Sequence, residues 1–268
     1  MQRPGTTTNM QTTLSTYLQI SNNLDRSLAT TASEPSVATA TAYYQAHIGD
    51  VKSIDDFMKD TRLYNYAMTA FGLQDMAYAK AFIRKVLTEG VSDPQSFANK
   101  LADDRFVQLA TTFDFSVQGD QTTQSTAAQQ GVVDRYTRQT LETQAGQDNQ
   151  AVQLALYFQR EAPTVKSAYG LLGDTALWTV VKTVFGFPDA MANADITVQA
   201  KAVDAKLNVA DLQDPAKVNQ LIARFAASWD AQNVTSDPIL SLFDTSGSSA
   251  TVDYNLLYTL TSLKHGGA

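Results

Sequence analysis

Histidines and paired carboxylates are the side chains of this 268-residue chain that could do acid–base chemistry. The two histidines, His47 and His265, lie far apart in the sequence. A general base needs a neighbouring acid or nucleophile, and the residues around each histidine form no motif that supplies one. We therefore interpret His47 as an ordinary surface or half-buried side chain and His265 as part of a C-terminal tail.

Two pairs of adjacent aspartates are the other candidates for acid–base chemistry. The pair Asp55–Asp56 follows Ser53, so we expect these carboxylates to favour the positive end of a helix. The pair Asp103–Asp104 lies between Lys100 and Arg105 and is interpreted as a solvated charge cluster. Paired carboxylates that cleave sugars need a cleft with aromatic walls, and nothing in the sequence predicts one.

Composition excludes several other kinds of site. The chain has no cysteine, which excludes disulfides, thiolate metal sites and cysteine nucleophiles. Its 13 glycines form no phosphate-binding loop, and no zinc-protease, EF-hand or nucleophile-elbow motif is present. The sequence therefore predicts no catalytic residue, no cofactor and no metal site, and we expect a protein that is not an enzyme.

Charge and hydropathy limit the partners. Lysine and arginine number 20 against 27 aspartates and glutamates, a net charge of −7. This balance argues against binding to nucleic acid or to an anionic membrane surface, since both require clustered cations. We expect no membrane insertion and no cleaved signal peptide, because the sequence has neither a long apolar run nor a basic start followed by an apolar stretch.

Helical periodicity dominates the chain and predicts an all-α fold. The clearest case begins at Asp60, which we expect to cap a helix that buries its apolar face over residues 63–71. Gly72 follows as the glycine that ends this helix, and Gly90 is expected to end the next one. Alternation typical of strands is nearly absent.

Changes of composition divide the chain into five segments. We predict a polar, partly disordered N-terminal arm with one heptad-like helix at 1–41, a first helical repeat at 42–115 and a linker at 116–131. A second helical repeat at 132–230 and a C-terminal helical segment and tail at 231–268 complete the chain. Met10 precedes the apolar stripe of the arm, so residues 1–9 are a possible addition to the natural start.

The two predicted repeats rest on an internal match. Residues 43–75 align without gaps on residues 157–189, and identical pairs include Asp60 with Asp174 and Gly72 with Gly186. The shared residues are helix caps, apolar positions and helix-ending glycines, which do no chemistry. The prediction is a multi-helix bundle built from two divergent repeats, whose halves pack on each other or swap elements.

Two apolar stripes lie near the ends of the chain, and each is too narrow to stabilise a lone helix. We predict that they pair with each other, with other proteins or with copies of the chain. The candidate interaction surface consists of Leu14, Tyr17, Leu18, Leu24, Leu28, Tyr254, Leu257 and Leu260.

Three long runs carry a resemblance to a known family. Residues Ala70–Phe106, Arg135–Ala190 and Asp211–Asp230 resemble an alphaproteobacterial family of uncharacterised helical proteins, and the resemblance extends over about residues 11–265. Members of that family are commonly encoded within or beside flagellar gene clusters. The resemblance implies an all-helical protein linked to motility and no particular activity, cofactor or site residue.

Three functions are compatible with these observations. The first is a non-enzymatic interaction protein, structural or accessory, of the flagellum or motility apparatus. The second is a cytoplasmic helical adaptor or chaperone that binds its partner between the repeat halves. The third, which the sequence favours least, is an enzyme or small-ligand binder with a site assembled between helices. We expect the chain to be cytoplasmic or exported through the flagellar secretion route, since exported flagellar proteins tend to lack cysteine and to begin with a polar, uncleaved segment.

Overall fold

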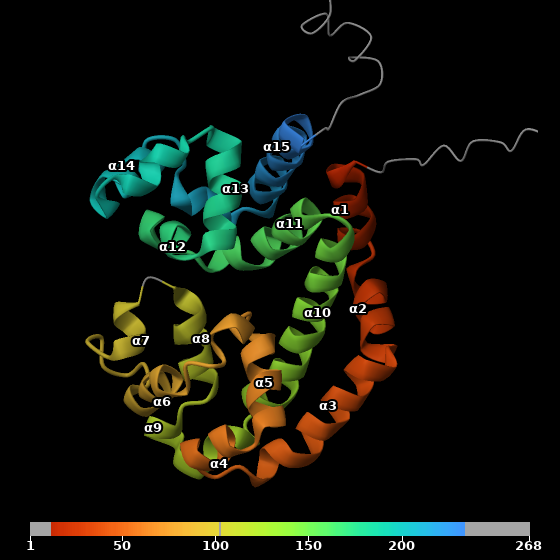
Figure 1. Cartoon of the computed structure of the whole chain (residues 1–268), viewed down its shortest axis with the longest axis vertical. Coiled ribbons are helices and arrows are strands. Elements are labelled where there is room, and N and C mark those ends of the chain that lie inside the picture. Colours follow the sequence, from red (N-terminus) through yellow and green to blue (C-terminus); the bar gives the residue numbers. More distant parts are fainter. Residues whose placement is uncertain (1–11, 102, 234–268) are drawn as a thin grey trace, which may run out of the picture. The chain divides into compact units, whose positions relative to one another are not determined.

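The structure is a computed structural model that describes residues 12–101 and 103–233 (Figure 1). These residues form helices and connecting turns without a strand, which confirms the all-α prediction for this part of the chain. The chain divides into two units, Met1–Asp230 and Ala231–Ala268. No helix in the described ranges has the length and apolar character needed to cross a membrane.

The helix bounds are as follows. The first part of the chain forms α1 Thr13–Ser21, α2 Leu24–Ser33, α3 Pro35–His47, α4 Ile54–Lys59, α5 Thr61–Ala70, α6 Lys80–Glu89, α7 Phe97–Lys100, α8 Asp104–Thr112 and α9 Phe115–Gln118. The second part forms α10 Val132–Asp148, α11 Gln150–Glu161, α12 Ala168–Gly173, α13 Thr175–Phe185, α14 Ile196–Asp204 and α15 Pro215–Asn233. Short 3-10 and π turns join them: η1 Ile48–Asp50, η2 Gln74–Met76, η3 Gly119–Gln124, η4 Ala127–Gly131, η5 Ala162–Thr164, η6 Asp189–Asn193 and η7 Val209–Gln213.

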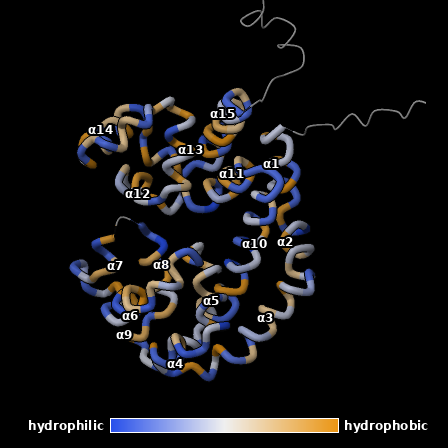
Figure 2. Tube along the Cα trace, in the orientation of Figure 1, coloured by the Kyte–Doolittle hydropathy of each residue, from blue (hydrophilic) through white to orange (hydrophobic). Residues whose placement is uncertain are grey.

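Two separate hydrophobic cores organise these helices. The first core lies among α3 to α9 and the start of α10, and its large buried side chains include Tyr44, Phe57 and Phe113. The second lies among α1 and α11 to α15, around Phe158 and Phe225. Hydrophobic and hydrophilic residues are interspersed along most of the helices (Figure 2), as expected where one face of a helix is buried. We call the helices around these cores the first and the second lobe.

Helix α10 belongs to both lobes and joins them. Val132 and Val133, at its start, are buried in the first core, whereas Ala145, near its end, packs against the second. The helix also packs on α5 of the first lobe and on α11 of the second. A single continuous helix therefore sets the spacing of the two lobes.

The N-terminal arm folds onto both lobes. Helix α1 packs on α11, α2 packs on α10, and α3 packs on α5. The expected single heptad-like helix is two helices, because α1 ends at Ser21 and α2 begins at Leu24. The break at residues 22–23 turns the two halves of the apolar stripe toward different neighbours.

Local capping signals are confirmed where the prediction used residues close in sequence. The Asp60 carboxylate accepts hydrogen bonds from the backbone N–H groups of Arg62 (2.9 Å) and Leu63 (3.0 Å) at the start of α5. Gly72, two positions after the last residue of α5, adopts φ 66°, and Gly90, directly after α6, adopts φ 62°. These left-handed conformations favour glycine, which has no Cβ to clash.

The polar segment 116–131 differs from its interpretation as a linker. It forms the end of α9, then η3 and η4, and it buries Thr122, Thr123 and Ala128 completely. The Thr123 hydroxyl donates to the Val51 carbonyl (2.7 Å), and the Ala128 carbonyl accepts from the Tyr44 hydroxyl (2.6 Å). The segment packs as part of the first lobe because its polar groups find backbone and side-chain partners there.

Candidate functional site

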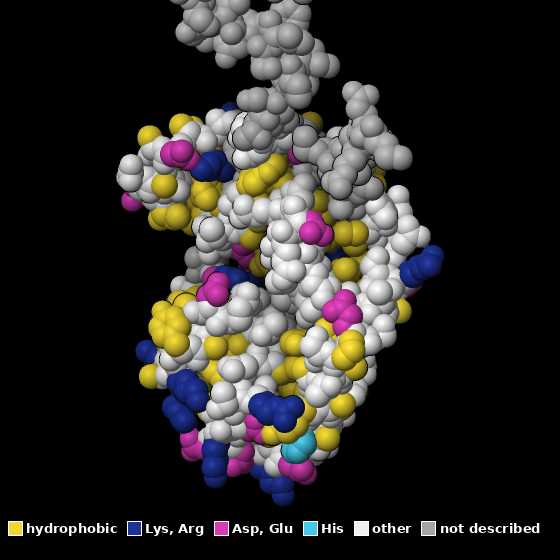
Figure 3. Space-filling view, turned by 45° about the vertical axis from the view of Figure 1, so that its right-hand side comes forward, with side chains coloured by type: hydrophobic (Ala, Val, Ile, Leu, Met, Phe, Trp, Pro, Cys, Tyr) yellow, Lys and Arg dark blue, Asp and Glu magenta, His cyan; other side chains and the backbone are white. Residues whose placement is uncertain are grey.

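An open cleft of about 1540 Å³ lies between the two lobes. Figure 3 shows this hollow with basic and acidic side chains at its edge. Its lining comes from α2 of the arm, from α8 and α10, from the segment that runs from α11 to α12, and from η7 with the residue before it. The lining side chains include Leu24, Leu28, Asp104, Val107, Gln108, Asp134, Arg135, Arg138, Gln159, Arg160, Glu161, Lys166 and Tyr169.

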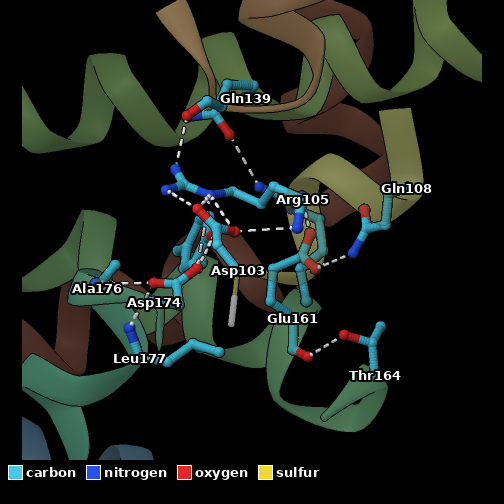
Figure 4. A network of polar contacts seen from close by, with 12 residues as sticks. Asp103, Arg105, Gln108, Gln139, Glu161, Thr164, Asp174, Ala176 and Leu177 are labelled. Carbon is cyan, nitrogen blue, oxygen red and sulfur yellow. Dashed lines mark hydrogen bonds and ion pairs between the residues drawn. The ribbon is translucent and has the colours of Figure 1, made fainter. Parts of the chain in front are cut away.

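A polar network connects the lobes beside this cleft (Figure 4). Asp103 caps the start of α8, and both its oxygens accept hydrogen bonds from the guanidinium of Arg105 (2.7–3.1 Å). Arg105 also donates to the carbonyl of Gly72 (2.7 Å) and lies 3.9 Å from the carboxylate of Asp174 in the second lobe. The interpretation of the 103–104 pair as a solvated charge cluster is therefore wrong for Asp103, whose carboxylate is mostly buried against Arg105.

Asp174 holds the second-lobe side of the network. Its Oδ1 accepts from the backbone N–H groups of Ala176 (2.8 Å) and Leu177 (3.0 Å) at the start of α13. Its Oδ2 accepts from the buried hydroxyl of Tyr157 (2.5 Å). Burial first, and then the charge of Asp174, raise the pKa of Tyr157, so this hydroxyl keeps its proton and donates it to the carboxylate.

A second group of charges is buried deeper, between α10 and α11. Glu142 is 0 % exposed, and its Oε1 accepts from Arg138 Nε (2.8 Å) and Arg160 Nε (2.9 Å). Arg160 Nη2 donates to the other oxygen of Glu142 (2.8 Å) and to Gln139 Oε1 (2.9 Å). Burial alone would lower the pKa of Arg160, but its contacts with Glu142 outweigh burial and raise the pKa, so Arg160 keeps its charge at neutral pH.

Arg135 of α10 and Gln108 of α8 extend the network along the cleft. Gln108 Nε2 donates to Glu161 Oε2 (3.0 Å), and Arg135 Nη1 donates to Gln108 Oε1 (2.8 Å). The guanidinium carbon of Arg135 lies 5.1 Å from the centre of the Phe71 ring. Glu161 also forms an ion pair with Arg160. Its carboxylate therefore contacts Arg160 directly and is linked to Arg135 through Gln108.

Fixed partners orient the buried carboxylates of this region. Arginines or backbone N–H groups donate hydrogen bonds to each of them. His47, the described histidine, stacks on Tyr43 with its Nδ1 2.8 Å from the carbonyl of that residue. Within residues 12–101 and 103–233, no group of three or more histidines and carboxylates could hold a metal ion.

The described residues of the predicted interaction surface lie in two kinds of environment, the interior of the second lobe and the protein surface or cleft wall. Tyr17 is 1 % exposed and donates its hydroxyl to Asn219 (3.0 Å), and Leu14 packs against the second core, so both belong to the interior. Leu18 is 42 % exposed, whereas Leu24 and Leu28 line the cleft. Tyr254, Leu257 and Leu260 lie outside the described residues, as does His265.

The sequence does not indicate most of the cleft residues, because they come from distant parts of the chain. One local signal was present, since Arg138 and Glu142 lie four residues apart on one face of α10. Such a pair on an exposed helix is common and marks no site. Its significance comes from the burial of Glu142, and burial is set by the packing of α11.

Replacing Asp60 with asparagine is expected to remove a pH-dependent part of the stability. Burial by itself would raise the pKa of this carboxyl, but hydrogen bonds from the backbone of Leu63 and from the Tyr43 hydroxyl outweigh it and lower the pKa. A carboxylate with a lowered pKa stabilises the fold above about pH 4 and loses that contribution as the pH falls below it. Asparagine keeps the capping oxygen, so the two proteins should differ most near neutral pH and converge near pH 3.

Chemical denaturation over this pH range measures the difference in the free energy of unfolding. Asp120→Asn removes the same charge from an exposed turn and serves as the control. Parallel profiles for Asp60→Asn and the wild-type chain would contradict the prediction.

Comparisons with known proteins agree with the fold. A family model described as "Protein of unknown function (DUF1217)" matches residues 70–218. The crystal structure of a protein from Agrobacterium tumefaciens is similar to this chain, with a TM-score of 0.78 and 52% sequence identity over 82% of this chain and 94% of that one. Comparison with curated proteins gives no match. The crystallised relative comes from an alphaproteobacterium, as the resemblance implied.

Proposed function

The chain belongs to the DUF1217 family of proteins of unknown function, and we propose that it is a non-enzymatic interaction protein that receives a segment of a partner in the cleft between its lobes. The observation that carries this proposal is the composition of the cleft. Apolar side chains that remain accessible, such as Tyr169 at 45 % exposed, lie next to charged groups held by fixed hydrogen bonds. Protein-binding surfaces combine apolar anchors with oriented polar groups in this way.

The arm supports the same location. Two of its predicted surface residues, Leu24 and Leu28, line the cleft, while Tyr17 fastens the arm to the second lobe. The apolar stripe therefore contributes both to the fold and to the wall of the cleft. We place the interaction surface in the cleft instead of along a free N-terminal helix.

We assign the partner to the bacterial motility apparatus because members of the family that the sequence resembles are commonly encoded within or beside flagellar gene clusters. The second function, that of a cytoplasmic adaptor or chaperone, uses the same cleft and differs in where the partner is met. A reporter fused to residues 1–40 separates the two. Export of the reporter supports a role outside the cytoplasm, and its retention supports the adaptor.

We further propose that the two lobes derive from one duplicated helical unit. Asp60 and Asp174, which are 114 positions apart, each cap a helix through two backbone N–H groups and each accept a tyrosine hydroxyl, from Tyr43 and Tyr157 respectively. The glycines that follow the two helices have φ 66° and 62°. Equivalent contacts at a constant offset support the repeat, since caps of this kind depend on specific side chains.

Replacing Tyr169 with alanine is expected to weaken the partner complex by about 2 kcal/mol, roughly 30-fold in affinity, because aromatic anchors contribute most to such interfaces. Tyr78, which is 82 % exposed and lies outside the cleft, supplies the matched control Tyr78→Ala. Both tyrosines are exposed, so each variant should keep the unfolding temperature within about 2 °C of the wild type.

The measurement combines motility with binding. A strain that lacks the gene should swim less well in soft agar, and the wild-type chain or Tyr78→Ala should restore swimming. Tyr169→Ala should restore it poorly and capture less of the partner. Normal swimming of the deletion strain would refute the link to motility, and full activity of Tyr169→Ala in both assays would refute the role of the cleft.

A further inference from the structure

Arg135 is held in a fixed position at the wall of the cleft. Its Nη1 donates to Gln108 Oε1 (2.8 Å), and its guanidinium lies over the ring of Phe71. Gln108 is itself oriented, because its amide nitrogen donates to Glu161 (3.0 Å). A guanidinium fixed in this way loses little side-chain freedom when it binds a further group.

The charge of Arg135 has no direct counter-ion among the described residues. Arg138 and Arg160, the neighbouring arginines of the cleft, both form ion pairs with Glu142, whereas Arg135 has only the neutral amide of Gln108 as a hydrogen-bond acceptor. Burial lowers the pKa of Arg135, and the charge of Arg160 adds to this effect against the opposing charge of Glu161. A carboxylate brought to this position would therefore gain an ion pair with a cation that lacks one.

The apolar part of the cleft suits a helix. Leu24 and Leu28 are four residues apart on α2 and form a short ridge, and Tyr169 is exposed on α12. Ridges of this spacing pack into the grooves between side chains of another helix. Two turns of a helix about 10–12 Å across occupy roughly 1,000 Å³, so a cleft of about 1540 Å³ accommodates them.

The acidic side chains of the cleft select against a polyanion. Asp104, Asp134 and Glu161 line the same walls, so a nucleic acid strand would meet repulsion at several phosphates. A peptide with a single carboxylate at the right place avoids that repulsion.

We propose that the cleft binds an amphipathic helix of a partner protein, whose aspartate or glutamate pairs with Arg135 while its apolar face covers Leu24, Leu28 and Tyr169. This inference rests on the proposed function and specifies the chemistry of the occupant.

The test first identifies the occupant in cells. A photoreactive phenylalanine analogue is introduced at position 169 and, as a control, at position 78, in a strain that expresses the chain from its own promoter. Mass spectrometry should locate the crosslink from position 169 in one segment of another protein, and that segment should carry an acidic residue and apolar residues at helical spacing. Position 78 should give no such crosslink. A crosslink to nucleic acid, to a basic segment or to a second copy of this chain would overturn the proposal.

The second step measures the ion pair with a synthetic peptide of that segment. Arg135→Gln should weaken its binding by about 10- to 100-fold, and Arg135→Lys should retain part of the affinity, since lysine keeps the charge without the planar fork. Arg62, which stacks on the ring of Tyr43 outside the cleft, supplies the control Arg62→Gln, with binding unchanged. A peptide with glutamine or asparagine in place of the acidic residue should bind wild type and Arg135→Gln equally.

These results separate the inference from the function on which it rests. If position 169 crosslinks to a partner but Arg135→Gln binds the peptide normally, the role of Arg135 is refuted and the cleft remains the binding site. If Arg135→Gln weakens the binding of the acidic and of the neutral peptide by the same factor, the ion pair is also refuted. If position 169 gives no crosslink, both the proposed function and this inference fail.

Discussion

Glu142→Gln is expected to lower the free energy of unfolding by about 3–5 kcal/mol, because it leaves two buried arginines without their shared carboxylate. Glu142 is 0 % exposed and accepts charged hydrogen bonds from both Arg138 and Arg160. Glutamine preserves the size of the side chain, so the effect reports charge and hydrogen bonding instead of a cavity. In a protein of this size the loss corresponds to a decrease of about 6–20 °C in the unfolding temperature.

Calorimetry and chemical denaturation measure this loss, and Glu89→Gln is the matched control. Glu89 and Lys85 also form an ion pair four residues apart on one helix, but both side chains are exposed. Removal of that pair should change the stability by no more than about 0.5 kcal/mol. A similar small effect for Glu142→Gln would show that Glu161 and the nearby amides suffice to hold the two arginines.

Asp174→Ala is expected to destabilise the chain by about 2–4 kcal/mol, compared with about 1 kcal/mol for Asp60→Ala. Each substitution removes a helix cap with two backbone hydrogen bonds and a tyrosine partner. Asp174 is 5 % exposed, and its removal leaves the hydroxyl of Tyr157 buried without an acceptor and weakens the hold on Arg105. Tyr43 is partly exposed, so water replaces Asp60 as its acceptor.

The two substitutions are controls for each other, because they occupy equivalent capping positions in the two lobes. Denaturant titrations of both variants give the comparison, and Asp174→Asn, which keeps a capping oxygen, should recover part of the loss. Equal destabilisation by Asp174→Ala and Asp60→Ala would contradict the prediction, since it would leave no contribution from the buried Tyr157 hydroxyl or from the contact with Arg105.

Features that depend on neighbouring residues were predictable. Asp60 and Gly72 delimit α5 as expected, because capping and left-handed turns involve residues within a few positions of each other. The interpretation of segment 116–131 as a linker differs from the structure, in which Thr123 is buried and donates a hydrogen bond to Val51, 72 positions away. The composition of a segment does not reveal a partner so distant in the sequence. The apolar stripe of the arm was recognised, but its break at residues 22–23 was missed.

The sequence by itself determined that the described chain is helical, where several of its helices begin and end, and that no familiar catalytic motif is present. Tertiary structure decided which charges are buried and that Arg105 of one lobe meets Asp174 of the other. It also decided that Arg135 lines the cleft with no direct counter-ion among residues 12–101 and 103–233. Helical caps and periodic apolar faces are local, so the chain encodes them within short windows. Burial and charge pairing depend on which surfaces meet in space, and the packing of helices distant in sequence sets them.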